Sequence, residues 1–321
     1  MRYIVYGVGA IGGVVAAALD KQGADVVGIA RGARLAALQE KGLILRSPEG
    51  TRQISLDCVP KAADLTARSD DIVLLVVKGQ DTMPALHDLR AAGFEDQPIF
   101  CVQNGVANET AALRFFPNVH GVNVMLPADY VDIHEAICWC SPTYGIFDVG
   151  RFPSGIDAAD KLLAEVLTPG GIMVRPVADV MAYKYGKLLM NLGNIVQAAL
   201  GRETKAPELI ETLRNEGEHI LDKAGIPWHD VGASDPRRSQ MKYGEVDGAT
   251  RVGSSTTQSL VRGTGSVETD YLNGEIVLLA RTMGEEAPAN AFAARLADRL
   301  ARDGSAPGSI SREMFAKGLG L

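Results

Sequence analysis

One lysine and two asparagines lie at helical spacing within an apolar stretch, KYGKLLMNLGN, which begins at residue 184. On an α-helix Lys187, Asn191 and Asn194 fall at i, i+4 and i+7, so they share one face. An alkoxide forms when a hydride reaches a ketone, and an ammonium group can both protonate and stabilise it. Asparagine amides can hold the substrate oxygens without competing for that proton.

The alternative is an amphipathic helix that turns a polar face to water. Solvated faces normally mix acids and bases, yet over 185–201 there is no Asp or Glu and Lys187 is the only cation. We therefore expect this stripe, which Lys184 and Gln197 flank, to be largely buried. A buried ammonium is costly unless it meets an anion, a hydrogen-bonding network or a reacting group. Lys187 is thus the candidate catalytic residue, although a lysine that only pairs within the core is the other interpretation.

A second motif, GVGAIGG at residues 7–13, fits the GxGxxG pattern between an expected strand and an expected helix. Gly7 permits the tight turn, Gly9 lets a pyrophosphate approach the backbone, and Gly12 lets the helix pack closely. The helix N-terminus supplies N–H groups and the positive end of a dipole. We predict a dinucleotide site there, whose backbone also includes Val8, Ala10 and Ile11.

The residues after the second expected strand favour NADP over NAD. NAD-binding proteins usually carry an Asp or Glu there for the ribose 2′-hydroxyl, whereas this chain has Ala30 and Arg31, with Arg34 one turn later. A guanidinium can pair with the 2′-phosphate in bidentate fashion. Lys78 follows another strand and could add a second cation. Ordinary solvated side chains are the alternative for these cations.

The elements that must position these residues form two domains. Apolar β-rich runs alternate with helical text, which predicts a doubly wound parallel sheet of the Rossmann-like α/β class. The expected strands are 2–6, 25–30, 71–77, 98–102, 118–124 and 172–177. Long helical patterns then follow at 180–200, 208–224, 268–283 and 289–302. We therefore predict a cofactor domain over 1–177 and an all-helical substrate domain over 178–321, with a loop-rich excursion at 225–254 and a weakly ordered tail at 303–321.

Composition narrows the class of partner. A net charge of −7 and a pI near 5.3 argue against a broad electrostatic footprint for nucleic acid or an anionic membrane. No apolar run reaches the length of a membrane span and no signal peptide fits, so we expect a cytoplasmic protein. The four cysteines lack metal-ligand spacing and the histidines form no HExxH pair. No metal site is predicted.

Four motifs in order resemble the ketopantoate reductase (2-dehydropantoate 2-reductase) family. They are GVGAIGG, the QNG at 103–105, the KLLMN at 187–191 and the segment SSTTQ…VETDYLNG over 254–274. The resemblance implies reduction of a small 2-oxo acid, most directly 2-dehydropantoate in pantothenate and coenzyme A biosynthesis, with NADP as cofactor. It also implies a helical second domain and, as is common in that family, a homodimer.

The resemblance also assigns roles to individual residues. Lys187 is similar to the family's proton donor, and Asn191 to its substrate-binding asparagine. Asn104 is similar to the residue between nicotinamide and substrate, and Ser255 to the one that receives the substrate carboxylate. Glu268 resembles the acid that holds the nicotinamide ribose. Finally, Arg31 and Lys78 match the cations for the 2′-phosphate.

Two departures from the family pattern fall on the substrate side. Many members carry a second asparagine at the position of Ile195, whereas here Asn194 stands one step earlier. Thr256 and Thr257 replace two apolar residues after the serine pair. The acyl substituent of the substrate therefore stays open. A β-hydroxyacid dehydrogenase and a non-catalytic NADP-binding sensor are the alternative interpretations.

Overall fold

The computed structural model describes residues 1–130, 132–232, 235–263 and 265–321. The chain forms two compact units. The first comprises Met1–Asn104, Asn108–Met181 and Asp235–Arg251, and the second comprises Gly105–Ala107, Ala182–Ser234 and Val252–Leu321. The chain thus passes between the units several times, whereas the sequence analysis placed a single boundary after residue 177. That boundary stays a prediction of where the substrate domain begins.

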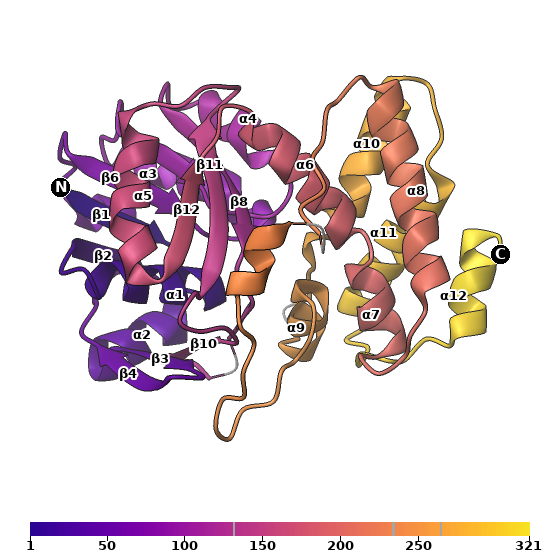
Figure 1. Cartoon of the computed structure of the whole chain (residues 1–321), viewed down its shortest axis with the longest axis horizontal. Coiled ribbons are helices and arrows are strands. Elements are labelled where there is room, and N and C mark those ends of the chain that lie inside the picture. The colour runs from indigo at the N-terminus through magenta and orange to yellow at the C-terminus, as the bar shows by residue number, and fades with distance from the viewer. Residues whose placement is uncertain (131, 233–234, 264) are drawn as a thin grey trace. The chain divides into compact units, whose positions relative to one another are not determined.

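The first unit is built on an eight-stranded sheet in the order β12-β11-β8-β7-β6-β1-β2-β5 (Figure 1). Its strands are β1 (Arg2–Tyr6), β2 (Asp25–Ile29), β5 (Asp57–Val59), β6 (Asp71–Leu75), β7 (Ile99–Cys101), β8 (Val119–Met125), β11 (Gly145–Arg151) and β12 (Ile172–Pro176). Neighbouring strands are parallel except β11, which runs antiparallel to β8. The predicted Rossmann-like sheet is confirmed, and β5 and β11 are additions to the strands expected from the sequence.

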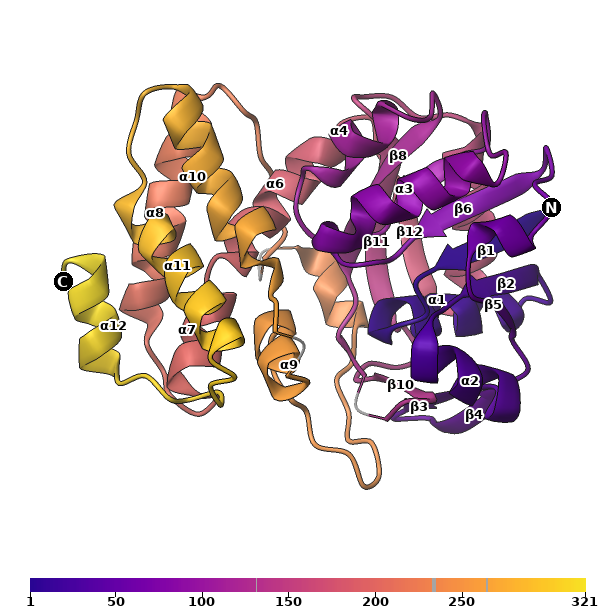
Figure 2. The ribbon, with the colours of Figure 1, turned by 180° about the vertical axis from the view of Figure 1, so that it is seen from behind.

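Helices cover both faces of this sheet. They are α1 (Ala10–Asp20), α2 (Gly32–Lys41), α3 (Thr82–Ala91), α4 (Asn108–Leu113) and α5 (Ala158–Gly170), with 3-10 turns η1 (Ala62–Asp64), η2 (Gly79–Asp81) and η3 (Pro236–Gln240). Figure 1 shows α5 in front of the sheet, and Figure 2, drawn from behind, shows α3 in front. Every residue of β1 and β6 is buried. Because successive side chains of a strand face opposite sides, a strand covered on both faces is mostly apolar, and the charged exceptions here, Arg2 and Asp71, pair with each other at 2.8 Å.

A second, smaller sheet in the first unit has the order β4-β3-β10-β9. Its strands are β3 (Leu43–Ser47), β4 (Gly50–Ile54), β9 (Ala128–Asp129) and β10 (Glu135–Cys138). Helix α1 packs closely on it, since a Cβ on Gly13 would lie 2.7 Å from the Cβ of Ala136. The glycine that follows the GxGxxG pattern thus serves this contact.

Residues 235–251 return to the first unit and are fastened there by charge and by backbone hydrogen bonds. The fully buried Asp148 on β11 accepts hydrogen bonds from Arg237 at 2.9 Å and from Arg175 at 2.9 Å. The amide of Gly244 donates to the carbonyl of Trp139 at 3.1 Å. The excursion predicted as loop-rich therefore packs against the cofactor unit.

The second unit is helical, as predicted. Its elements are α6 (Val180–Asn191, which begins two residues inside the first unit), α7 (Asn194–Leu200), α8 (Pro207–Lys223), α9 (Ser255–Val261), η4 (Glu268–Tyr271), α10 (Asn273–Thr282), α11 (Pro288–Arg302) and α12 (Arg312–Leu319). Glycine allows the close approach of α8 to the end of α6, because a Cβ on Gly217 would lie 2.7 Å from Leu192 and 2.9 Å from Leu189.

Two expectations for this unit were wrong. The helix predicted over 180–200 is broken after Asn191, and a new helix begins at Asn194. The single continuous face expected for Lys187, Asn191 and Asn194 therefore does not extend past the break. The tail over 303–321 contains α12, whose Phe315 is fully buried and packs edge-on against Phe292 at 5.5 Å.

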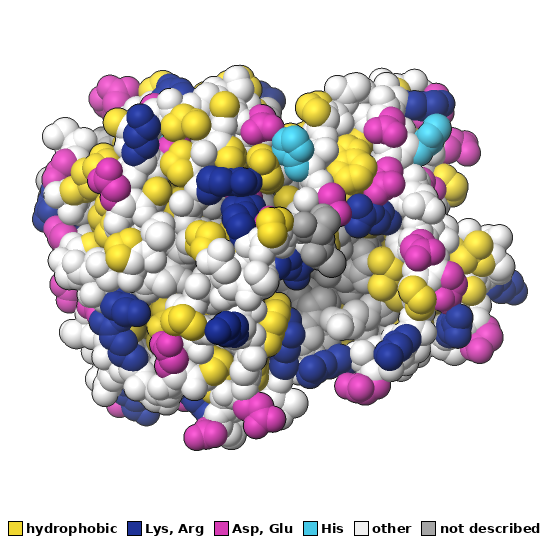
Figure 3. All heavy atoms as spheres, viewed as in Figure 1, with side chains coloured by type: hydrophobic (Ala, Val, Ile, Leu, Met, Phe, Trp, Pro, Cys, Tyr) yellow, Lys and Arg dark blue, Asp and Glu magenta, His cyan; other side chains and the backbone are white. Residues whose placement is uncertain are grey.

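Charged side chains of both signs are spread over the face drawn in Figure 3. Among the described residues, no helix combines the length and the apolar character that a bilayer crossing requires.

Candidate functional site

The glycine-rich turn of the first unit has the geometry that a pyrophosphate needs. Gly7 adopts a φ of 108°, which favours glycine, and its amide donates to the carbonyl of Ile29 at 3.0 Å. A Cβ on Gly12 would lie 2.1 Å from the carbonyl oxygen of Gly7, so only glycine fits there. A Cβ on Gly9 would meet nothing within 4 Å. The turn therefore leaves open space above Gly9, where α1 begins.

Arg31 stands at the N-cap of α2, directly after β2, and is exposed. Its guanidinium donates to the hydroxyl of Tyr6 at 2.9 Å, and that hydroxyl donates to Asp88 at 2.7 Å. Asp88 also accepts from the amide of Ala62 at 2.8 Å. Burial, followed by the neighbouring Asp88, raises the pKa of the Tyr6 hydroxyl, so it remains a neutral donor. Tyr6, which sequence reasoning counted only as a strand residue, thus orients the predicted phosphate-binding arginine.

Arg34 is fixed on the glycine-rich turn rather than simply solvated. Its Nε donates to the carbonyl of Val8 at 2.9 Å, and its guanidinium lies 4.7 Å from the ring centre of Tyr130. Burial lowers the pKa of this guanidinium from its ordinary value. Arg34 therefore tethers the first turn of α2 to the predicted pyrophosphate loop.

Lys78 and Asn104 follow the adjacent strands β6 and β7. Lys78 is half-buried at the N-cap of η2, and the carbonyl of Asn104 accepts from the Asn108 side chain at 3.1 Å. The buried Gln103 donates to the carbonyl of Val77 at 2.8 Å and so ties the ends of the two strands together. Gln103 belongs to the QNG motif, yet the sequence analysis assigned it no role.

In the second unit, α6 carries Lys187 and Asn191 one turn apart. Lys187 is half-buried and Asn191 is buried. The glycine between the two lysines of this stretch has a packing role, because a Cβ on Gly186 would lie 1.7 Å from the carbonyl oxygen of His229. Lys184 is only 2% exposed, so it is more deeply buried than the candidate catalytic lysine. From the sequence, Lys184 was expected only to lie beside the polar face that carries Lys187, Asn191 and Asn194.

The break after α6 brings Asn194 to Ser255. The Asn194 amide donates to the Ser255 hydroxyl at 3.5 Å, and the Asn194 carbonyl accepts from the Ser254 hydroxyl at 3.2 Å. Gln197 on the next turn of α7 accepts from the amide of Ser254 at 2.6 Å. Two predicted substrate residues 61 positions apart thus meet in one unit. The departures Thr256 and Thr257 are buried just behind them, and the Thr257 hydroxyl lies 2.9 Å from that of Ser254.

Glu268 opens η4 and is half-buried. The end of the same turn packs closely on Gly105, since a Cβ there would lie 2.8 Å from the carbonyl oxygen of Tyr271, and both residues belong to the second unit. Gly105 also has a φ of 79°. The glycine-rich turn, Arg31, Lys78 and Asn104 belong to the first unit, whereas Lys187, Asn191, Asn194, Ser255 and Glu268 belong to the second.

Two other features of the first unit, a His–Asp group and a pocket, lie apart from these motifs. His120, Asp157 and Asp160 could converge on a metal ion. However, Asp157 caps α5 through the amide of Ala159 at 2.8 Å, Asp160 accepts from His120 at 2.8 Å, and Arg151 donates to Asp157 at 2.9 Å. This cluster is a helix cap with its charges already paired, so we assign no metal to it.

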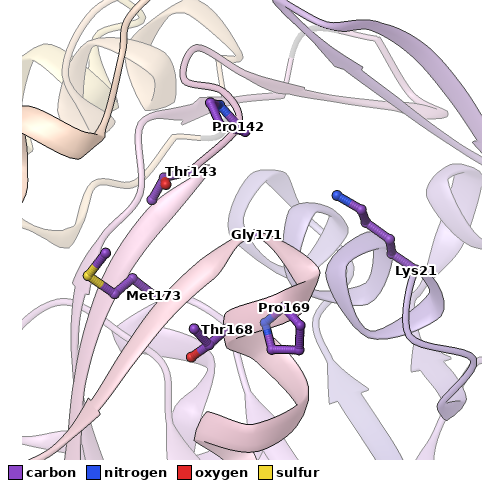
Figure 4. Close-up of a pocket in the computed structure, with 7 residues that line it drawn as sticks. All are labelled: Lys21, Pro142, Thr143, Thr168, Pro169, Gly171 and Met173. Atoms are coloured by element: carbon purple, nitrogen blue, oxygen red, sulfur yellow. The ribbon is translucent and has the colours of Figure 1, made fainter.

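Figure 4 shows the second feature, a pocket of about 280 Å³ in the first unit. It is lined by Lys21, Pro142, Thr143, Thr168, Pro169, Gly171 and Met173. None of these residues belongs to the motifs described above.

Comparison with known proteins identifies the family. The family model described as ketopantoate reductase PanE/ApbA matches residues 3–130, and its C-terminal counterpart matches residues 179–301. The 2-dehydropantoate 2-reductase of Archaeoglobus fulgidus is 27% identical over 299 residues, which cover 90% of this chain and 94% of that protein. The enzyme of the same name from Mesorhizobium japonicum is 27% identical over 331 residues, covering 94% and 98%.

Solved structures show the same fold. A PanE/ApbA family ketopantoate reductase from Ralstonia eutropha JMP134 matches with a TM-score of 0.76 and 23% identity, covering 95% of this chain and 99% of its own. A D-mandelate dehydrogenase, solved with NADH and anilino(oxo)acetate, matches with a TM-score of 0.78 and 21% identity over the same shares. Since the two family models together match most of the sequence, the chain belongs to the ketopantoate reductase family, whose members are oxidoreductases that act on CH–OH groups.

Proposed function

We propose that this protein reduces a 2-oxo acid to the 2-hydroxy acid with NADPH, and that 2-dehydropantoate is its substrate in pantothenate and coenzyme A biosynthesis. The observation that carries the proposal is the meeting of Asn194 with Ser255 directly after the helix that bears Lys187 and Asn191, in a chain of this family. A nicotinamide cofactor supplies the hydride when it is bound.

The residues of the second unit then have distinct roles. Lys187 donates a proton to the oxygen of the former ketone and stabilises the negative charge that develops on it. Asn191 and Asn194 donate to substrate oxygens. The Ser255 hydroxyl donates to the substrate carboxylate, and the neighbouring Asn194 amide restricts its orientation. Hydrogen bonds that strengthen as the alkoxide forms contribute to kcat, whereas uniform contacts contribute only to KM.

The residues of the first unit fit NADPH. The φ of Gly7 and the open space above Gly9 suit a pyrophosphate at the start of α1. Arg31 is exposed and oriented by Tyr6, and Ala30 stands where an acid would repel a 2′-phosphate. Lys78 is the second candidate cation for that phosphate. In our proposal Asn104 lies between nicotinamide and substrate, and Glu268 from the second unit accepts from the nicotinamide ribose.

Our proposed substrate is 2-dehydropantoate, but other 2-oxo acids differ from it only in the group attached to the keto carbon. The buried Thr256 and Thr257 next to Ser255 depart from the family pattern. The D-mandelate dehydrogenase of similar fold was solved with NADH and anilino(oxo)acetate. A test panel therefore has to include aryl and branched 2-oxo acids beside 2-dehydropantoate, and both cofactors.

The test is steady-state oxidation of NADPH and NADH over that panel. We expect kcat/KM for 2-dehydropantoate to exceed that for the other acids, and NADPH to be preferred over NADH by about tenfold or more, since charge-assisted hydrogen bonds contribute about 1.5–3 kcal/mol. Arg31→Ala should reduce the preference without changing NADH use. Ser255→Ala should raise KM for the oxo acid and leave NADPH affinity unchanged.

Four results would contradict parts of this proposal. Equal use of both cofactors would refute the role of Arg31, and an unchanged KM in Ser255→Ala would refute the carboxylate site. Turnover of 3-hydroxy acids alone would favour the β-hydroxyacid dehydrogenase alternative. Binding of NADPH without any turnover would favour the sensor alternative.

A homodimer and a cytoplasmic location stay predictions. Light scattering of the purified protein tests whether it is a homodimer.

A further inference from the structure

The break between α6 and α7 depends on one backbone carbonyl, that of Leu192. In a continuous helix this carbonyl would accept from the amide of Val196, four residues on. Here the Val196 amide donates to the carbonyl of Gly193 instead, at 3.1 Å. Leu192 is fully buried, so its carbonyl needs another partner.

That partner is the side chain of Asn273, the first residue of α10. Its amide nitrogen donates to the Leu192 carbonyl at 3.1 Å and to the side-chain oxygen of Asn290 at 2.9 Å. Asn273 is 1% exposed and lies 81 positions from Leu192 in the sequence. Both amide protons of Asn273 are thereby used.

Asn290 is in turn held from α8. It is fully buried on α11, and its amide nitrogen donates to the carbonyl of Leu213 at 3.0 Å and to the carboxylate of Glu216 at 2.9 Å. The same carboxylate accepts from the backbone amides of Ala289 at 2.9 Å and Asn290 at 2.8 Å, which caps the N-terminus of α11. A chain of hydrogen bonds thus connects Glu216, Asn290, Asn273 and the carbonyl of Leu192.

The break that these hydrogen bonds accompany changes the direction of Asn194 relative to a continuous helix. Asn191 is the last residue of α6 and Asn194 is the first of α7, so the two residues of the break separate them. If the helix continued, the side chain of Asn194 would stand only about 60° from that of Asn191 around a single helix axis, so the two would share one face. The observed break instead lets the Asn194 amide reach Ser255, while its carbonyl accepts from Ser254.

We infer that Asn273 is a positioning residue for the substrate side of the site: by holding the Leu192 carbonyl it keeps the helix broken and Asn194 directed at Ser255. Its effect on kinetics rests on the proposed function, but its effect on the break does not. A purely structural asparagine would lower stability without a selective effect on substrate binding. The two roles therefore differ in their kinetic signature.

The test uses Asn273→Leu, which keeps the branched shape of the side chain and removes both donors, beside Asn273→Ser, which keeps one hydroxyl donor and serves if the leucine variant folds poorly. We expect KM for the 2-oxo acid to rise about tenfold, or about 1.4 kcal/mol, while KM for NADPH stays within about twofold. Amide exchange over 192–198 should change in the same variants. The control is Phe315→Leu in α12, which removes packing from the same unit at a distance in sequence from the break.

The control separates positioning from general destabilisation. Phe315→Leu should lower the melting temperature and leave both KM values and the exchange over 192–198 unchanged. An Asn273 variant whose KM for the oxo acid and whose exchange over 192–198 match the wild type would overturn the inference. If the wild type reduces no 2-oxo acid, the proposed function fails. The exchange measurement then decides alone whether Asn273 holds the break.

Discussion

Replacement of Lys187 by alanine gives the most direct test of the chemistry. Lys187 lies half-buried on α6, one turn before the buried Asn191. If its ammonium protonates the developing alkoxide, it acts chiefly in the transition state. Lys187→Ala should then lower kcat strongly while KM for NADPH stays nearly unchanged, because the glycine-rich turn belongs to the other unit.

The magnitude follows from the role and from the burial. General acid catalysis typically contributes 10² to 10⁴-fold, which is about 3–5 kcal/mol of barrier. Truncation of a half-exposed lysine within a helix, to the residue with the best helix propensity, should change the free energy of unfolding by about 1 kcal/mol or less. The loss of kcat should therefore greatly exceed the loss of stability. The assay measures kcat at saturating NADPH on protein whose melting curve shows that it is folded.

Lys184 makes the comparison sharper than a surface lysine alone. Because Lys184 is 2% exposed, Lys184→Ala removes a buried ammonium and should lower the melting temperature more than Lys187→Ala does. The neutral control is Lys223→Ala on α8, which loses only an exposed ion pair with Glu285 at 2.7 Å. A folded Lys187→Ala variant that keeps more than about a tenth of wild-type kcat would refute the catalytic role. A larger kcat loss in Lys184→Ala would transfer that role to Lys184.

Three further predictions concern other positions. Tyr6→Phe leaves Arg31 without the hydroxyl at 2.9 Å that orients it, so the NADPH-to-NADH ratio of kcat/KM should fall about threefold to tenfold. Gly186→Ala would bring a Cβ to 1.7 Å from the His229 carbonyl oxygen, and urea unfolding should show a loss of about 2 kcal/mol or more. Asp157→Asn keeps the cap of α5 but loses the charge, so its melting temperature should be lower than that of the wild type near neutral pH, with the difference vanishing in acid.

The pH window for Asp157 follows from its pKa. Burial alone would raise that pKa, but His120, Arg151 and the α5 amides together hold it below the ordinary 3.8. The carboxylate therefore stabilises the folded protein fully above about pH 3.8, and the contribution is lost as pH falls through the lower folded value. A melting-temperature difference that persists at lower pH would contradict this assignment.

For Gly186→Ala the control is Gly274→Ala, where the nearest atom to the added Cβ would lie at an ordinary 3.5 Å.

The central strands β1 and β6 could be predicted because every residue of each is buried, and their runs RYIVY and DIVLL are accordingly mostly apolar. The small sheet escaped prediction because its pairing is non-local: Ile44 on β3 pairs with Glu135 on β10. The strand β4, GTRQI, is mostly exposed. A strand that is exposed on most of its length has no regular alternation of apolar and polar residues, so its sequence carries no local strand pattern.

The helix break was hidden for a different reason. KYGKLLMNLGN has unbroken helical periodicity, and a lone Gly193 is only a weak breaker. What decides the break is the carbonyl of Leu192, and its partner Asn273 lies far along the chain. The last helix, by contrast, carried local signals: Ser311 caps α12 and Gly320 ends it in the left-handed conformation. These two caps were local signals of a helix inside the segment that was expected to be a weakly ordered tail.

The polar residues of the opening stretch divide by helix face. At about 100° per residue, Lys184, Lys187 and Asn191 fall within about 60° of one another on α6. The opposite side is occupied by packing: Gly186 lies against the backbone of His229, and Leu189 lies against Gly217. Glycine and leucine therefore pack one side of the helix against its neighbours, and the polar residues lie on the other side. General acid catalysis requires only one of the two ammonium groups on that side, so the paired substitutions at 184 and 187 test whether Lys187, as we propose, is the proton donor.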